Sequence, residues 1–260
     1  MSAATRLAGF AAVLVLVFAG AAVAGGAVDV DRSAPPPEEG HGMEMTADPI
    51  RGLAVSEHGL TLEQTYDGRE LRFRITDRPG RTVRDFDVEH TKRMHLIVVR
   101  RDMTSFQHLH PRQDADGSWS VPLALREPGA YRVFADFSVG GEPRTLATDL
   151  AIDGDVRTTP LPAPTRTVRT DGLEVTMSDD LRFSITRDGR PVAVQDYLGA
   201  KGHLVALREG DLAFLHVHPD ERSLRFEATF PTAGSHRLFL QFKTGDGRLH
   251  TAAFTQEVTR

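Results

Sequence analysis

The sequence predicts an all-β chain made of two tandem antiparallel β-sandwiches, and two observations lead to this prediction. The first is an internal repeat, because segment 95–111 matches segment 203–219 at an offset of 108 residues, without a gap and with 7 of 17 positions identical. The second is a series of short runs rich in Val, Leu, Phe and Thr, separated by Gly, Asp and Pro, without a convincing helical period after residue 30. A chain of 260 residues has room for two such domains, each with its own core.

The N-terminus predicts export. Arg6 precedes an apolar run over residues 7–24, and this run ends in the small residues Ala-Val-Ala. The pattern is typical of a signal peptide over residues 1–24 that is cleaved before Gly25. The run of about 18 residues also reaches the lower limit for a membrane-spanning helix, so an uncleaved anchor stays the alternative, with membrane contact only through residues 7–24. In both cases we expect the remaining chain to be extracellular or in the cell envelope.

Residues 25–50 are predicted to form a disordered tether. They are rich in Gly, Pro and Glu and show no hydrophobic period. The tether contains His41, Met43 and Met45, whose imidazole and thioether groups are ligands that suit Cu(I). We expect these three residues to act as a mobile metal collector, and the alternative is a solvated tether whose methionines have no such role.

Strand-like segments recur in both halves and indicate the domain boundaries. Residues 71–76 alternate apolar and polar side chains, as a half-buried strand does, and residues 181–186 repeat the pattern. Such strands predict one sandwich over residues 50–156 and a second over residues 166–260. The proline-rich segment 157–165 cannot join the interior of a sheet and is therefore the predicted linker.

Composition excludes several function classes. The net charge is only −5 and the basic residues are scattered, so no surface for nucleic acid is expected. Cysteine is absent, which excludes disulfides, thiolate metal sites and cysteine nucleophiles. Serine and carboxylate residues show no spacing typical of a catalytic triad or a carboxylate pair, so we expect a binding protein and not an enzyme.

Each repeat carries the motif Phe-x-His-x-His-Pro, at residues 106–111 and 214–219. A strand projects alternate side chains to the same face, so His108 and His110 should lie together. The same alternation should bring together the corresponding histidines of the second repeat, His216 and His218.

The preceding segment should form the other arm of a hairpin in each repeat. With a loop of two or four residues around Arg101-Asp102, His95 stands directly opposite His108, and the same register places His203 opposite His216. Directly opposed side chains have Cβ atoms about 4.5–5.5 Å apart. A three-residue loop with a bulge would instead turn His95 to the other face.

The sequence thus predicts one three-imidazole metal site in each repeat. The two sites are His95, His108 and His110 in the first repeat, and His203, His216 and His218 in the second. The face that carries them also carries apolar residues such as Ile97 and Val205, so the histidines should lie at the end of an apolar core face. Two alternatives stay open: the histidines are structural and bond only to loop carbonyls, or the two triads face each other and share one ion. His90, His236 and His250 are further candidates for a fourth ligand, although each fits a surface position better.

Copper is the metal that this ligand set favours. Imidazole-rich sites in folded domains, together with a Met/His tether and no thiol, are expected for Cu(I) or Cu(II) outside the cytoplasm. Zinc is the less favoured metal, because Cu(II) binds more tightly than zinc to a given nitrogen site.

Segments 95–111 and 197–219 resemble exported bacterial proteins of an actinobacterial type that are associated with heavy metals or copper. The strand pattern over residues 71–76 is similar to the small immunoglobulin-like domains of YtkA-like exported proteins. The resemblance covers both predicted domains but not the tether, and it implies two tandem immunoglobulin-like β-sandwiches. The chain lacks the spaced His and Met pattern of the periplasmic copper chaperones.

The function that we expect is the binding of copper, which the protein sequesters or transfers to a copper-transport protein. The alternative from a different class is an extracellular interaction module in which the repeated histidines are structural.

Overall fold

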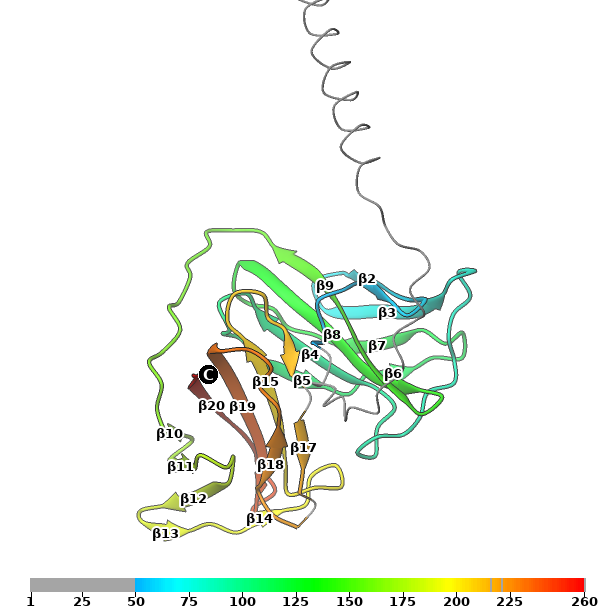
Figure 1. Cartoon of the computed structure of the whole chain (residues 1–260). Coiled ribbons are helices and arrows are strands. Elements are labelled where there is room, and N and C mark those ends of the chain that lie inside the picture. The colour runs from blue at the N-terminus through cyan, green and yellow to red at the C-terminus, as the bar shows by residue number, and fades with distance from the viewer. Residues whose placement is uncertain (1–49, 216, 221, 260) are drawn as a thin grey trace, which may run out of the picture. The chain divides into compact units, whose positions relative to one another are not determined.

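The computed structural model describes residues 50–259 except 216 and 221, and this part of the chain is all-β (Figure 1). Its residues belong to one compact unit that contains both repeats. Within the described part, no helix is long and apolar enough to cross a membrane. The predicted signal or anchor segment 1–24 lies outside the described residues, as do His41, Met43 and Met45.

The first repeat consists of two antiparallel sheets with a core between them. One sheet has, in spatial order, β1 (Ser56–Glu57), β2 (Leu60–Tyr66), β3 (Glu70–Asp77), β7 (Trp119–Pro122) and β6 (Arg112–Gln113). The other has β5 (Gln107–Leu109), β4 (His95–Arg100), β8 (Gly129–Val139) and β9 (Glu142–Ile152).

The second repeat is built in a similar way around its own core. One sheet has β10 (Thr167–Thr170), β11 (Leu173–Met177), β12 (Phe183–Arg187) and β13 (Arg190–Pro191). The other has β14 (Val194–Gln195), β19 (Gly234–Thr244), β15 (Gly202–Arg208) and β16 (Phe214–Leu215), with β20 (Leu249–Val258) also paired to β19. A two-stranded ladder contains β17 (Val217–Pro219) and β18 (Phe226–Ala228).

The alternating sequence pattern explains why these strands form sandwiches. In β3, Leu71, Phe73 and Ile75 are buried in the core, while the two arginines between them are exposed. Strand β12 repeats this arrangement with Phe183 and Ile185 inside. The prediction of an all-β chain with two antiparallel sandwiches is therefore confirmed.

A third apolar cluster contains residues of both repeats, and the strand face that carries the histidines contributes to it. In β4, Leu96 and Val98 point into the core of the first repeat, whereas Ile97 and Val99 point the opposite way. Together with Val205 they belong to an apolar cluster that contains residues of both repeats, which we call the inter-repeat core. The sequence predicts that these residues lie on an apolar core face. The structure shows that this core lies between the two repeats, so the face with the histidines lies at their junction.

The hairpin register also differs from the prediction. Ile97, not His95, is directly opposite His108, because β4 pairs with β5 two residues further along than expected. The turn accounts for the difference: the N–H of Met103 donates to the carbonyl of Arg100 at 2.8 Å, and Met103 has a positive φ of 61°. A shift of two residues conserves the faces of a strand, so His95 still faces the same side as His108 and His110.

The hairpin of the second repeat has the same register, but its two strands stop pairing earlier in the chain. Ala206 pairs with Leu215, so the strands are shifted by two residues from the predicted pairing. Val217 then pairs with Ala228 of β18 instead of continuing along β15. In the first repeat the equivalent residue, Leu109, still pairs with β4. The chain therefore leaves the hairpin sheet earlier in the second repeat, so the corresponding residues Leu109 and Val217 pair with different strands.

Loss of an aromatic anchor from the inter-repeat core should destabilise the protein strongly. Phe239 is 3% exposed, and its ring stacks on that of Phe106 with centroids 4.0 Å apart. We expect Phe239→Ala to lower the free energy of unfolding by about 3–5 kcal/mol, as measured by urea denaturation. Leu249→Ala is the control, because Leu249 is 44% exposed and should change stability by less than about 1 kcal/mol. Equal effects of the two substitutions would contradict the inter-repeat packing.

Candidate metal centre

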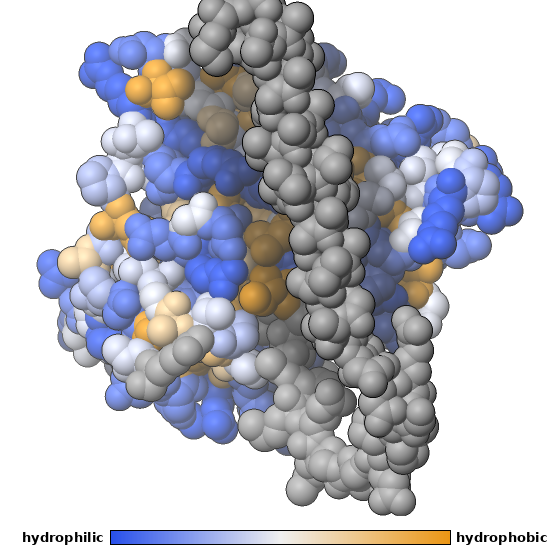
Figure 2. Space-filling model, turned by 45° about the horizontal axis from the view of Figure 1, so that its top comes forward, coloured by the Kyte–Doolittle hydropathy of each residue, from blue (hydrophilic) through white to orange (hydrophobic). Residues whose placement is uncertain are grey.

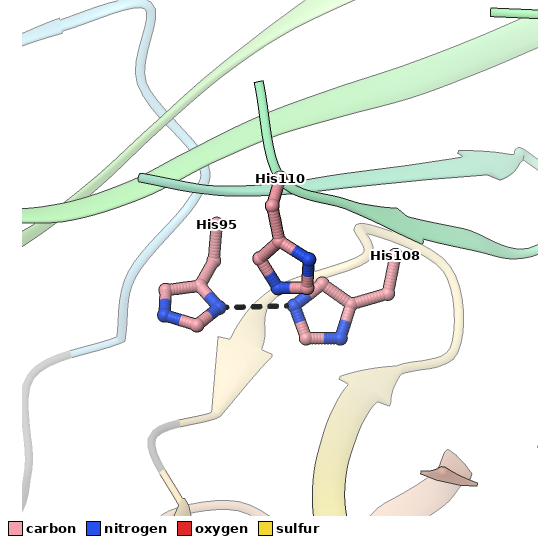
Figure 3. A group of neighbouring side chains, drawn as sticks. All are labelled: His95, His108 and His110. Carbon is pink, nitrogen blue, oxygen red and sulfur yellow. Dashed lines mark hydrogen bonds between the residues drawn. The ribbon is translucent and has the colours of Figure 1, made fainter. Parts of the chain in front are cut away.

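Three histidines of the first repeat converge on one point. His95 lies at the start of β4, His108 in β5 and His110 directly after β5, and the three rings point toward one another (Figure 3). One nitrogen from each ring lies within 4.8 Å of the other two. The closest pair is Nδ1 of His95 and Nε2 of His108, at 3.1 Å. The grouping of these three predicted ligands thus exists in the fold.

The spacing of the rings suits a tetrahedral ion. With metal–nitrogen distances near 2.0–2.1 Å, the ring centroids of two imidazoles on one tetrahedral ion lie about 5 Å apart. The observed centroid distances are 5.4 Å for His95–His108, 5.1 Å for His95–His110 and 4.9 Å for His108–His110. The spacing of the three rings is therefore compatible with three imidazoles on one tetrahedral ion.

The outer nitrogens of two rings have hydrogen-bond acceptors. Nε2 of His95 donates to the carbonyl of Glu89 at 3.2 Å, and Nδ1 of His108 donates to Oε1 of Gln241 at 2.9 Å. The amide of Gln241 is oriented by its own Nε2, which donates to Thr251 at 3.3 Å. Metal-bound histidines have outer bonds of this kind, because such bonds fix the ring and the tautomer.

These outer hydrogen bonds determine whether the inner nitrogens carry a proton or a lone pair. A neutral imidazole has one N–H, and in His95 and His108 that N–H is directed outward, so both inner nitrogens present lone pairs to each other. In the same region, Nε2 of His110 is buried and has no hydrogen-bond partner among the described residues. A cation at the centre of the triad would satisfy all three nitrogens at once, and a purely structural role leaves them unmatched.

Burial keeps the histidines neutral, as metal ligands must be. It lowers the pKa of His95 from the usual 6.5 to about 4, an effect that the Glu89 carbonyl partly opposes. Burial and the nearby His95 also lower the pKa of His110 to about 4. The pKa of His108 lies well below its usual value, first through burial and then through the neighbouring imidazoles. Protons therefore compete weakly for these nitrogens at neutral pH.

The metal-free protein should lose stability as the pH falls from about 6.5 toward 4. In this window the unfolded chain binds protons on His95, His108 and His110, which the folded protein keeps neutral. Asp136, whose pKa is raised to about 6, acts in the opposite direction, but the three histidines outweigh this single carboxyl, so acid favours unfolding. For His95, whose pKa falls to about 4, the loss is about 3 kcal/mol, because one pKa unit corresponds to about 1.4 kcal/mol. Urea denaturation at several pH values measures the slope. A stability that is constant between pH 6.5 and 4.5 would contradict the depressed pKa values.

The second repeat contributes to the same site. A cavity of about 60 Å³ is lined by His95, His108 and His203, and also by His90 and Asp136. Since one water occupies about 30 Å³ in the liquid, the cavity has room for a small ligand. Burial raises the pKa of Asp136 to about 6. The cavity is therefore lined by imidazoles of both repeats and by a carboxyl group of the first repeat.

Of the second predicted triad, the structure describes His203 and His218. His203 lies near the first triad, with its ring centroid 6.3 Å from that of His95. His218 lies on β17 and is exposed, because this strand pairs with β18. His216 lies outside the described residues. Among the residues described, the three-ligand group with nitrogens within 4.8 Å is the one from the first repeat.

Sequence reasoning missed Gln241, which accepts the hydrogen bond from His108, and Asp136, which lines the cavity. Gln241 and Asp136 occupy matching positions in β19 and β8, and each is a polar residue within a largely buried strand. That isolated polarity was the signal that could have identified them. The carbonyls of Glu89 and Tyr197, which accept hydrogen bonds from His95 and His203, belong to the backbone and have no signature in the sequence.

Two solved structures that match this chain are weakly similar to it. S. aureus TarS matches with 10% identity, a TM-score of 0.22 and 77% of this chain covered, and this chain spans 36% of that protein. Its fragment 217–571 matches with 10% identity, a TM-score of 0.21 and 79% coverage, and this chain spans 57% of the fragment. Scores this low establish neither a shared fold nor a function. No curated protein matches the chain significantly.

A protein-family model gives a clear match. The family described as a domain of unknown function (DUF8832) matches residues 52–154 and again residues 164–260. The two matched segments correspond to the two β-sandwiches and together cover most of the chain. The chain therefore belongs to the DUF8832 family, of which it carries two copies in tandem.

Proposed function

We propose that this protein binds one copper ion at His95, His108 and His110, at the junction of its two repeats, and sequesters the ion or transfers it outside the cytoplasm. The observation that carries the proposal is the hydrogen bonding of the rings. The outer nitrogens of His95 and His108 donate to oxygen atoms, while the inner nitrogens are 3.1 Å apart and present lone pairs. That arrangement suits a cation, because without one no proton lies between the two inner nitrogens.

The donor set supports copper as the metal. Three neutral imidazoles suit Cu(II), Cu(I) and zinc, and the affinity order places Cu(II) above zinc. The Met/His segment at residues 41–45 adds soft ligands that suit Cu(I), and the apolar run over residues 7–24 supports export. Under this proposal the tether collects the ion, the junction holds it, and a copper-transport protein is the partner that receives it.

Titration of the metal-stripped full-length protein with Cu(II), Cu(I) and Zn(II) tests the proposal. It is run beside a variant that lacks the tether ligands, with His41→Ala, Met43→Leu and Met45→Leu. We expect both proteins to retain one tight copper site, with weaker binding of zinc. Copper binding that disappears with the tether substitutions would make the tether the binder and the sandwiches its scaffold.

The interaction-module alternative predicts a different outcome, in which neither protein binds copper tightly. A docking module of the hydrophobic kind exposes a broad apolar patch. The face in Figure 2 is mostly hydrophilic, with apolar residues in small groups, and so does not favour this alternative. The exposed large hydrophobic side chains among the described residues are Ile50, Leu53, Val55, Val88, Val156 and Leu249.

A further inference from the structure

The triad supplies three of the four ligands of a tetrahedral site, and a histidine of the second repeat lies nearby. His203 is 8% exposed and lines the same cavity as His95 and His108. Its ring centroid is 6.3 Å from that of His95 and 6.1 Å from that of His108. These distances exceed the spacing of about 5 Å for two imidazoles on one ion by roughly 1 Å.

The hydrogen bonding of His203 is the same as that of His95. Nε2 of His203 donates to the carbonyl of Tyr197 at 2.9 Å, and Nε2 of His95 donates to the carbonyl of Glu89 at 3.2 Å. In both cases the acceptor lies six residues before the histidine. The tautomer with its N–H on Nε2 leaves the lone pair of His203 on Nδ1, which is the nitrogen that His95 presents to the triad.

The inter-repeat core explains how two repeats can supply one site. Val205 of β15 packs in the same apolar cluster as Ile97 of β4, so the two equivalent strands face the same junction. A contact across the junction already exists at the site, because Gln241 of the second repeat accepts the hydrogen bond from His108. The cavity of about 60 Å³ gives His203 room to approach.

We infer that His203 is the fourth protein ligand, so that the ion is bound by imidazoles of both repeats and ties the repeats together. The inference rests on the proposed function, since it concerns the same ion. A site closed by four protein ligands is suited to holding an ion, whereas a site with a bound water at the fourth position is suited to catalysis. The bound ion should therefore stabilise the docking of the two repeats.

The test uses the full-length protein with the three tether substitutions, loaded with one equivalent of Cu(II). His203→Ala removes the ring, and His203→Gln offers an amide that can keep the bond to Tyr197 if the alanine variant does not fold. Pulsed electron paramagnetic resonance counts the bound imidazoles. We expect four in the parent and three in each variant, with affinity at least about 10-fold lower. His218→Ala is the matched control, because His218 is the exposed residue of β17, and it should change neither quantity.

The outcomes separate the inference from the function on which it rests. Unchanged affinity and three imidazoles in both the parent and the His203 variants would overturn the inference and leave the triad as the metal site. A loss of one imidazole in His90→Ala, but not in His203→Ala, would also overturn it and assign the fourth position to His90. A parent that binds no copper at all would overturn both the inference and the proposed function.

Discussion

Replacing His108 with alanine should abolish tight metal binding. The substitution removes one of three converging nitrogens and the hydrogen bond that orients the ring on Gln241. We expect the dissociation constant for Cu(II) to rise at least about 1,000-fold, which corresponds to about 4 kcal/mol. The variant should still fold, because His108 is only partly buried.

Thermal unfolding with and without Cu(II) measures this effect. A ligand present at 1,000 times its dissociation constant stabilises the folded state by about 4 kcal/mol, which is roughly a 10 °C rise in melting temperature for a chain of this size. The parent should show this rise, and His108→Ala should lose it. His218→Ala is the control that should retain it. A full copper-induced rise in His108→Ala would exclude the triad as the binding site.

The residue at position 241 should set the metal affinity without touching the metal. Gln241 accepts the N–H of His108 and thereby directs the lone pair on Nε2 toward His95. Gln241→Leu removes the acceptor and should weaken copper binding about 10- to 100-fold. Gln241→Glu provides an acceptor that cannot donate, so it enforces the ligand tautomer and should bind copper at least as tightly as the parent.

Two comparisons make the Gln241 experiment specific. Gln195→Leu removes an exposed glutamine of β14 that donates to the carbonyl of Gly245, and it should leave copper affinity unchanged. Nitrogen chemical shifts of the His108 ring report the tautomer directly in metal-free protein. If Gln241→Glu and Gln241→Leu weaken copper binding equally, the amide acts through packing and not through the tautomer of His108.

The sequence was sufficient to predict which histidines share a face, but not which residues pair. Side chains in a strand alternate with a period of two, so His95, His108 and His110 remain together in any register shifted by two residues. The register itself depends on the turn, where Met103 and Ser105 have positive φ values of 61° and 52°. Turn prediction relies on Gly or Asn at such positions, and these residues give no such signal.

The partner of the histidine face was not predictable from periodicity alone. An apolar face of a strand is buried equally well by its own sandwich or by a neighbouring domain, and the pattern of Ile97 and Val99 is the same in both cases. The structure buries these two residues in the inter-repeat core. For the same reason the sequence could not show that His203 lies beside the first triad, or that Gln241 crosses the junction to reach His108.

The two Phe-x-His-x-His-Pro motifs differ in structure because the second stops pairing with its hairpin partner earlier in the chain. Phe214 and Leu215 pair with β15, but Val217 pairs with β18. His218 on β17 is exposed, whereas its counterpart His110 belongs to the triad. Both repeats contain the same Phe-x-His-x-His-Pro residues, so the difference arises from the strands that compete for pairing. Such competition depends on contacts distant in sequence, which a local pattern does not contain.

Anomalous diffraction at the copper absorption edge, from crystals of the copper-loaded full-length protein, locates the bound ion. We expect one strong peak at the junction of the repeats, about 2.0–2.1 Å from Nδ1 of His95 and Nε2 of His108. Copper located elsewhere in the folded part, or a junction without any anomalous peak, would rule out the three histidines as the copper site and leave them as a structural feature of the fold.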